Sequence, residues 1–198
     1  MTSASVLAFT CAQLGARSLY RAVTLDLTLE RGEGRVLVDV ARGNGFDLAF
    51  QRHLANLHDV GRTHYALPWD ATDLRLACRG RGTVLDGASA SLPLFVAWVA
   101  LLAGRPLPTP FLATGVATHG SDALEPAPHA FARGKVDVAR AYAQQAAAGS
   151  AHPTFWLPRG SETDGLASPA LALREVGSLR EAVLAILGLP PRTAEGAS

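Results

Sequence analysis

The apolar segment Leu92–Ala103 constrains the fold more than any other part of the chain. It contains no charged side chain, and its residues are those of a helix that is apolar all round. Such a helix is buried on most sides, so the rest of the chain has to enclose it. Gly104 and Pro106 follow at positions typical of a helix end. Because the segment contains Pro93 and is too short to cross a bilayer, we predict a core helix and no membrane association.

Composition and charge indicate one globular domain in the cytoplasm. The 198 residues are 48% hydrophobic and 18% charged, which suits a domain over residues 1–189 followed by a disordered tail, 190–198. A formal charge of +1 gives no electrostatic footprint for nucleic acid, so no nucleic-acid partner is expected. Cys11 and Cys78 form neither a disulfide framework nor a zinc pattern, and we expect no metal and no cofactor. The N-terminus lacks the basic region of a signal peptide.

Periodicity predicts helices interspersed among strands, and therefore an α/β (α+β) domain. Two alternating segments separated by a Gly-containing turn predict a β-hairpin, 23–29 with 35–40. Further strands are expected at 73–78, 111–117 and 154–157, and a loop at 121–133. Helices are expected at 46–58, 92–103, 136–148 and 178–187, the last opened by a capping box of Ser178 and Glu181.

A turn-like segment, Leu85–Ser91, precedes the apolar helix and places Ser89 at its N-terminus. Unpaired N–H groups and the positive end of the helix dipole gather there, and they can hold the oxyanion that acyl-transfer chemistry forms. Serine is equally favoured at this position as an N-cap with no catalytic role. The segment by itself supports both interpretations.

In chain order, several short motifs resemble the proteolytic domain of Lon-type proteases. The clearest is Asp86-Gly87-Ala88-Ser89-Ala90, which resembles the family's DGxSA signature. The family's L-T-G-x-P, T-G-E and V-L-I-P segments, and its closing helix, have counterparts in this order: 102–106, 114–115, 155–158 and 176–187. The resemblance covers about 23–187 and implies a single domain with the ribosomal-protein-S5-domain-2-like fold and a Ser-Lys dyad.

The resemblance implies a serine endopeptidase in which Ser89 is the nucleophile and Lys135 the base. Main-chain N–H groups near Ala88 and Ser89 would stabilise the oxyanion, Thr114 would help to hold the lysine, and Asp86 would shape the loop. Two other alignments stay open: one puts Tyr142 at the lysine position, and one places Lys135 on an exposed strand over 133–136. The expected partners are a peptide or protein substrate, a second copy of the chain, and a partner chain that supplies regulation or unfolding, because no Walker motif is present.

Departures from the family pattern support a second hypothesis, a catalytically inactive Lon-like domain used for protein binding or assembly. Val116 stands where the family has an acidic residue, and Ser91 where it has glycine. A third hypothesis is an α/β-hydrolase, because Gly87-Ala88-Ser89-Ala90-Ser91 approaches the family's G-x-S-x-G motif and the triad order Ser89, Asp122 or Asp137, then His152 is permitted. In a non-Lon variant, His119 or His129 would serve Ser89 as the base.

Overall fold

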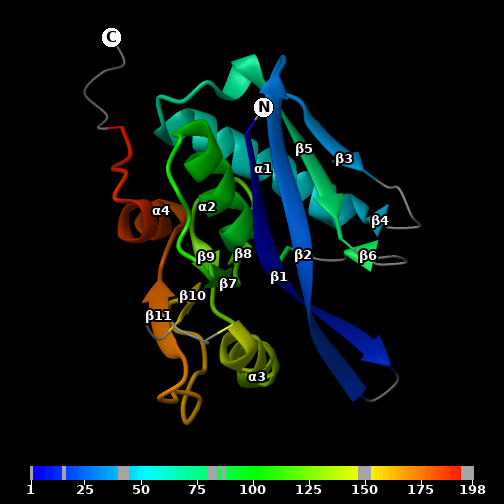
Figure 1. Ribbon diagram of the computed structural model, residues 1–198, viewed down its shortest axis with the longest axis vertical. Helices are drawn as coiled ribbons and strands as arrows, with labels where there is room; N and C mark the ends of the chain where they lie inside the picture. Colours follow the sequence, from blue (N-terminus) through cyan, green and yellow to red (C-terminus); the bar gives the residue numbers. More distant parts are fainter. Residues whose placement is uncertain are drawn as a thin grey trace.

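A computed structural model describes residues 2–14, 17–39, 45–79, 84–85, 88–146 and 153–192. Its centre is a seven-stranded mixed sheet in the order β11-β10-β7-β1-β2-β5-β3 (Figure 1). Its strands are β1 (Thr2–Leu14), β2 (Arg17–Arg31), β3 (Val36–Asp39), β5 (Thr72–Cys78), β7 (Leu112–Ala113), β10 (Thr154–Pro158) and β11 (Ala172–Val176). Two small sheets pair β4 (Gly45–Phe46) with β6 (Val84–Leu85), and β8 (Val116–Ala117) with β9 (Leu124–Glu125). The α/β class predicted from the sequence is confirmed.

The helices cover the two faces of the sheet unequally (Figure 1). They are α1 (Leu48–His64), α2 (Ser91–Leu102), α3 (His129–Ala146) and α4 (Leu179–Leu187), with a 3₁₀ turn, η2, at Trp69–Ala71. Val6 and Ala8 of β1 face the core that contains α1, α2 and α4, whereas Leu7 and Phe9 face the core under α3. This alternation follows from the period of two along a strand. The sheet therefore separates two cores.

Helix α2 lies in the larger core, as its apolar sequence predicts. Every residue from Ser91 to Ala100 is buried. Pro93 falls in the first turn, where its missing N–H has no helical partner in any case. Gly104 follows the helix with φ +62°, the left-handed conformation that closes a helix end. No helix in the described parts of the chain is both long and apolar enough to cross a membrane.

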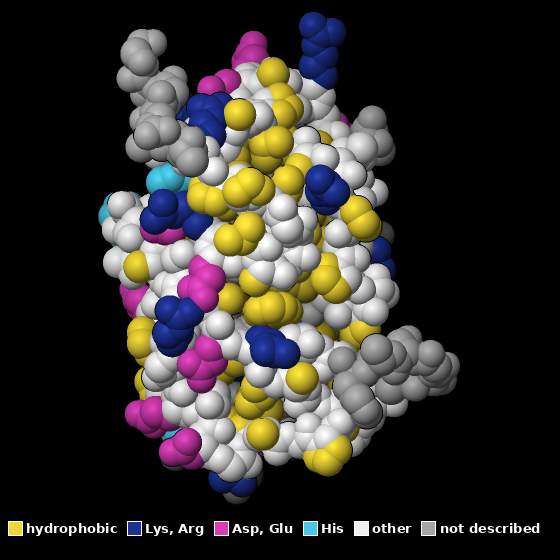
Figure 2. Space-filling model, turned by 90° about the vertical axis from the view of Figure 1, so that its left-hand side faces the viewer, with side chains coloured by type: hydrophobic (Ala, Val, Ile, Leu, Met, Phe, Trp, Pro, Cys, Tyr) yellow, Lys and Arg dark blue, Asp and Glu magenta, His cyan; other side chains and the backbone are white. Residues whose placement is uncertain are grey.

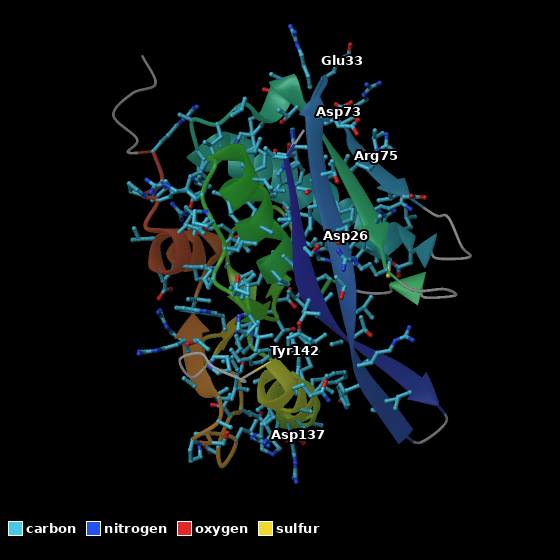
Figure 3. The ribbon with its side chains drawn as sticks, in the orientation of Figure 1. Asp26, Glu33, Asp73, Arg75, Asp137 and Tyr142 are labelled. Atoms are coloured by element: carbon cyan, nitrogen blue, oxygen red, sulfur yellow. The ribbon has the colours of Figure 1, made fainter. Side chains whose placement is uncertain are left out.

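The predicted hairpin of 23–29 with 35–40 is wrong. Strand β2 pairs antiparallel with β1 on one side and β5 on the other, and β3 pairs parallel with β5. Asp73 of β5 fixes the turn between β2 and β3, because its carboxylate accepts hydrogen bonds from the main-chain N–H groups of Glu33 and Arg35, at 2.8 and 2.9 Å. Figure 3 shows Glu33 and Asp73 together at this end of the sheet. The turn thus carries the chain across the end of β5, so that β3 pairs with the edge of β5 that faces away from β2.

Two predicted helix boundaries and one predicted loop are also corrected. Helix α1 begins after Asp47, whose carboxylate caps Phe50 N at 2.7 Å, and it continues to His64 instead of His58. Helix α3 begins at His129, inside the segment predicted as a loop. The strand expected at 111–117 is divided into β7 and β8, and the break between them matters for the site below.

The last helix is confirmed, including its start. Ser178 caps α4 by accepting a hydrogen bond from Glu181 N at 3.1 Å, and Gly188 ends the helix with φ +66°. Figure 2 shows the face of the molecule that carries α4 and β11, on which apolar side chains form a band between charged ones. Leu184 of α4 is half exposed in this region.

Candidate active site

Ser89 lies in a tight turn immediately before α2. The N-cap of the helix is Ala90, which makes no side-chain cap, so the interpretation of Ser89 as an N-cap is wrong. Ser91 braces the turn instead, because its main-chain N–H and its hydroxyl both donate to the carbonyl of Ala88, at 2.8 and 2.6 Å. The Ser89 hydroxyl is half-buried and donates to the Phe9 carbonyl of β1 at 3.3 Å.

The two residues between β7 and β8, Thr114 and Gly115, bind this turn. Gly115 N and the Thr114 hydroxyl both donate to the Ser89 carbonyl, at 2.9 and 3.2 Å. Gly115 permits the close approach, since a Cβ there would lie 3.2 Å from atoms of both Leu92 and Pro158. The main chain around Ser89 is therefore fixed by Ser91, which bonds Ala88, and by the segment Thr114–Gly115, which bonds Ser89 itself.

Lys135 reaches the same place from the other side of the sheet. It lies on the buried side of α3, on a helix whose small and apolar residues pack against β1, β7 and β10, and it is only 7% exposed. Its Nζ donates to Thr114 Oγ1 at 3.1 Å. Burial lowers the pKa of Lys135 from 10.5 to about 8, and the nearby thiol of Cys11 acts weakly in the opposite direction.

Thr114 joins the two groups. A threonine hydroxyl has one proton and can also accept, and here the proton goes to the Ser89 carbonyl while the oxygen accepts from Lys135. The lone pair of a neutral Lys135 amine is therefore not used by Thr114. Ser89, Thr114 and Lys135 line one cavity of about 300 Å³. In the described structure the hydroxyl of Ser89 donates its hydrogen bond to the Phe9 carbonyl, and Lys135 Nζ donates to Thr114.

The rest of the cavity wall is mostly apolar. Ala88 and Gly115 lie beside Ser89, and Pro158 comes from the end of β10. The rest of the wall is formed by Val116, which the sequence singled out only as a departure from the family pattern, and by five residues that it did not single out: Glu125, Pro126, Ala127, Pro128 and Phe131. These five were missed because the segment 121–133 was predicted as a loop, although two prolines and one phenylalanine near a serine can form an apolar wall.

The alternatives for the base are not brought to Ser89 within the described residues. Tyr142 extends from α3 (Figure 3), is 37% exposed and lines a separate groove with Phe111. The strand predicted for 133–136 is wrong, because these residues belong to α3. Asp86 and His152 lie outside the described residues.

The candidate triad residues that are described have other partners. His129 Nδ1 lies 3.1 Å from the Glu162 carbonyl oxygen, and His119 lines a different cavity beside α1. The carboxylate of Asp122 pairs with Arg180, and that of Asp137 pairs with Arg140. Among the residues that the structure describes, no group of three His, Cys, Asp or Glu side chains could hold a metal ion.

Lys135 is the only lysine in the chain, and every other cationic side chain apart from histidine is an arginine. Arginine stays protonated at any ordinary pH, so Lys135 alone among these groups can lose a proton near neutrality.

No protein-family model and no curated protein matches the chain.

Proposed function

We propose that the protein is a Lon-like serine endopeptidase with a dyad of Ser89 and Lys135 in a fold of the ribosomal-protein-S5-domain-2 type. The observation that carries the proposal is the hydrogen-bonded chain from the buried Lys135 amine through Thr114 to the main chain of Ser89. A lysine with a pKa of about 8 has a substantial neutral fraction at slightly alkaline pH. General-base activation of serine requires a neutral amine that can come within hydrogen-bond reach of the hydroxyl, and the shared cavity supports this arrangement.

In the proposed reaction, Ser89 Oγ attacks the carbonyl carbon of the scissile peptide bond while Lys135 Nζ takes the hydroxyl proton. The negative charge that develops on the carbonyl oxygen is stabilised by main-chain N–H groups of Ala88 and Ser89 at the positive end of α2. The Lys135 ammonium then donates its proton to the leaving amine as the C–N bond breaks. Water hydrolyses the acyl-enzyme by the same route, with the amine as base.

The close packing around Ser89 supports a catalytic role better than a passive one. Preorganisation requires that the reacting group and its base be fixed by their neighbours. Two hydrogen bonds fix the Ser89 carbonyl, Ser91 braces the turn, and Thr114 holds the amine. The same site needs no bound nucleotide, so we expect it to act on flexible peptides, or on folded proteins that a partner chain unfolds.

Labelling with a fluorophosphonate probe, followed by cleavage of an unstructured protein, tests the proposal. The probe reacts with an activated serine hydroxyl, and mass spectrometry locates the adduct. We expect a single adduct on Ser89, its loss in Ser89→Ala, and labelling slowed by about 10²–10⁴-fold in Lys135→Met. Ser168→Ala is the matched control and labels at the parental rate. If the parent protein formed no adduct, or if the adduct formed at the parental rate in Lys135→Met, the result would contradict the dyad.

One observation favours the inactive Lon-like domain as a second candidate. The Ser89 hydroxyl is hydrogen-bonded to Phe9 and has to leave that partner before it can meet Lys135. A domain that keeps this bond permanently would serve protein binding or assembly, and the probe would then leave Ser89 unmodified at every pH.

Light scattering in solution separately tests the homo-oligomer that the resemblance implies, and a monomer at all concentrations would count against it.

A further inference from the structure

The end of the β1–β2 ribbon lies over α3 at the position of Lys135. Figure 1 shows these two strands continuing together past the ends of their neighbours and passing beside α3. Cys11 and Tyr20 are cross-strand partners in this extension. Phe9, two residues before Cys11 and on the same face of β1, packs in the core under α3.

Tyr20 contacts α3 at three successive points. Its hydroxyl donates to the Ala130 carbonyl at 3.2 Å, and its ring meets the ring of Phe131 edge-on, with 6.3 Å between centroids. The third point is Gly134, where a Cβ would lie only 2.3 to 2.6 Å from three carbons of the Tyr20 ring. The aromatic ring therefore rests directly on the helix main chain, in the space that any other residue's side chain would fill.

Gly134 and Phe131 connect Tyr20 to the candidate site. Gly134 is the residue before Lys135, and Phe131 forms part of the wall of the Ser89 cavity. Glycine inside a helix costs about 1 kcal/mol relative to alanine, so the close contact with Tyr20 provides a reason for this residue here.

We propose that Tyr20 is the positioning residue that fixes the first turns of α3 and keeps water away from Lys135. Tyr20 does not touch the reacting atoms. It acts through the main chain of Gly134 and the ring of Phe131, and Cys11 beside it belongs to the same cover. The consequence for catalysis rests on the proposed function, whereas the shielding of the amine does not.

The titratable groups near the amine are few. Among the described residues, Cys11, the cross-strand partner of Tyr20, is the one whose electrostatic interaction raises the pKa of Lys135. Thr114 is the polar but neutral partner of Nζ on the opposite side. A change in the protonation of Lys135 on altering Tyr20 would therefore report mainly on access of water.

The single lysine makes the proposal directly measurable. Protein grown with lysine carrying ¹³C at Cε gives one lysine signal, whose chemical shift against pH reports the protonation of Lys135. We expect a midpoint near 8 in the parent chain and a rise of at least about one unit in Tyr20→Ala, because hydration restores the charged form. Tyr20→Phe keeps the ring on Gly134 and is expected to stay within a few tenths of a unit of the parent (an order-of-magnitude expectation).

Tyr142→Ala is the matched control, since Tyr142 lies on α3 and is exposed away from the cavity. The midpoint of the Lys135 titration in this variant should equal that of the parent. A midpoint in Tyr20→Ala equal to that of Tyr142→Ala overturns the proposal. If Tyr20→Ala does not fold, Tyr20→Ser, which removes the ring in the same way, should show the same upward shift.

Labelling of Ser89 separates this inference from the proposed function. A shifted Lys135 midpoint without any Ser89 adduct in the parent would support the shielding by Tyr20 and refute the peptidase. A Ser89 adduct together with an unshifted midpoint would refute the shielding and leave the peptidase standing. If the shielding by Tyr20 and the peptidase function are both correct, the rate of Ser89 labelling in Tyr20→Ala should reach its plateau at a higher pH than in Tyr20→Phe.

Discussion

Replacing Lys135 by methionine should change the pH dependence of stability in a defined direction. Methionine keeps an unbranched apolar side chain but removes the amine. In the native state the pKa of Lys135 is about 8, against 10.5 for an exposed lysine. A group whose native pKa is depressed by burial binds its proton more weakly in the folded chain than in the unfolded one. Stability of the parent protein therefore rises as pH increases through the window from about 8 to 10.5.

The size of the effect follows from the shift. Each pKa unit corresponds to about 1.4 kcal/mol, so keeping the charged amine buried costs about 3 kcal/mol at pH 7. At pH 10 the unfolded chain is itself partly deprotonated, and the cost falls below about 1 kcal/mol. The difference in unfolding free energy between the parent and Lys135→Met should thus move by about 2.5 kcal/mol over this range, in favour of the parent at high pH.

Urea unfolding followed by circular dichroism, at pH 7, 8, 9 and 10, measures this difference. Every other titratable group is present in both proteins, so the contributions of these groups largely cancel. Arg133→Met removes an exposed cation from the same helix and is the matched control, with a difference expected to stay constant with pH. Parallel stability curves for the parent and Lys135→Met would show that the amine is not held in a dry environment, and would remove the basis for Lys135 as a base.

Three further predictions concern the reaction, the helix and the sheet. The rate of Ser89 modification in the parent should rise about tenfold per pH unit below about 8 and level off above it, and a rate independent of pH from 6 to 9 would exclude the amine as the base. Gly134→Ala should destabilise the protein by about 1–3 kcal/mol through its clash with Tyr20. In a Tyr20→Ala background the same change should instead stabilise by up to about 1 kcal/mol, and equal effects in the two backgrounds, measured by urea unfolding, would contradict the contact. Hydrogen bonds from Arg35 and from the main chain lower the pKa of Asp73 to about 2, so its contribution to stability is present above pH 4 and lost as pH falls through about 2. Asp73→Asn should therefore melt at a lower temperature than the parent at pH 6, with the gap closing in acid, and a gap that does not change with pH would show that the charge of Asp73 is unimportant.

The sequence predicted the helices whose signals are local. Helix α2 is apolar on all sides, and α4 has both a capping serine and a closing glycine, so neither depends on knowledge of the sheet. Strand β1 was missed for the opposite reason. Its central residues, Val6–Phe9, are buried on both faces between the two cores, and a segment buried on both faces has no alternation to recognise.

The topology and the start of α3 depend on contacts between distant residues. The position of β3 is fixed by Asp73, some forty residues after the turn that it binds, which no hairpin pattern can indicate. Helix α3 was predicted over 136–148, whereas it begins at His129 and contains Gly134, a residue that is unfavourable inside a helix. The ring of Tyr20 occupies the space beside that glycine, so tertiary packing outweighs local propensity.

For the candidate site, the sequence resemblance singled out Ser89, Thr114 and Lys135, and the structure places all three around one cavity. The role of each remains a prediction until the labelling experiment. Neither Phe9 nor Tyr20 could be associated with the site in advance, since both belong to strands whose partners were not known. Asp86 was expected to shape the loop, and that expectation is untested because it lies outside the described residues.

The sheet also separates the two elements that carry Ser89 and Lys135. Ser89 is attached to the layer of helices on one side, through α2, and Lys135 to the single helix on the other side, α3. Both line one cavity with Thr114, the residue that follows β7. The thickness of the sheet and its packing thus act as a spacer between hydroxyl and amine. A side chain enlarged or shortened in either core, far from the cavity, would therefore move Ser89 relative to Lys135 without altering any residue that lines the cavity.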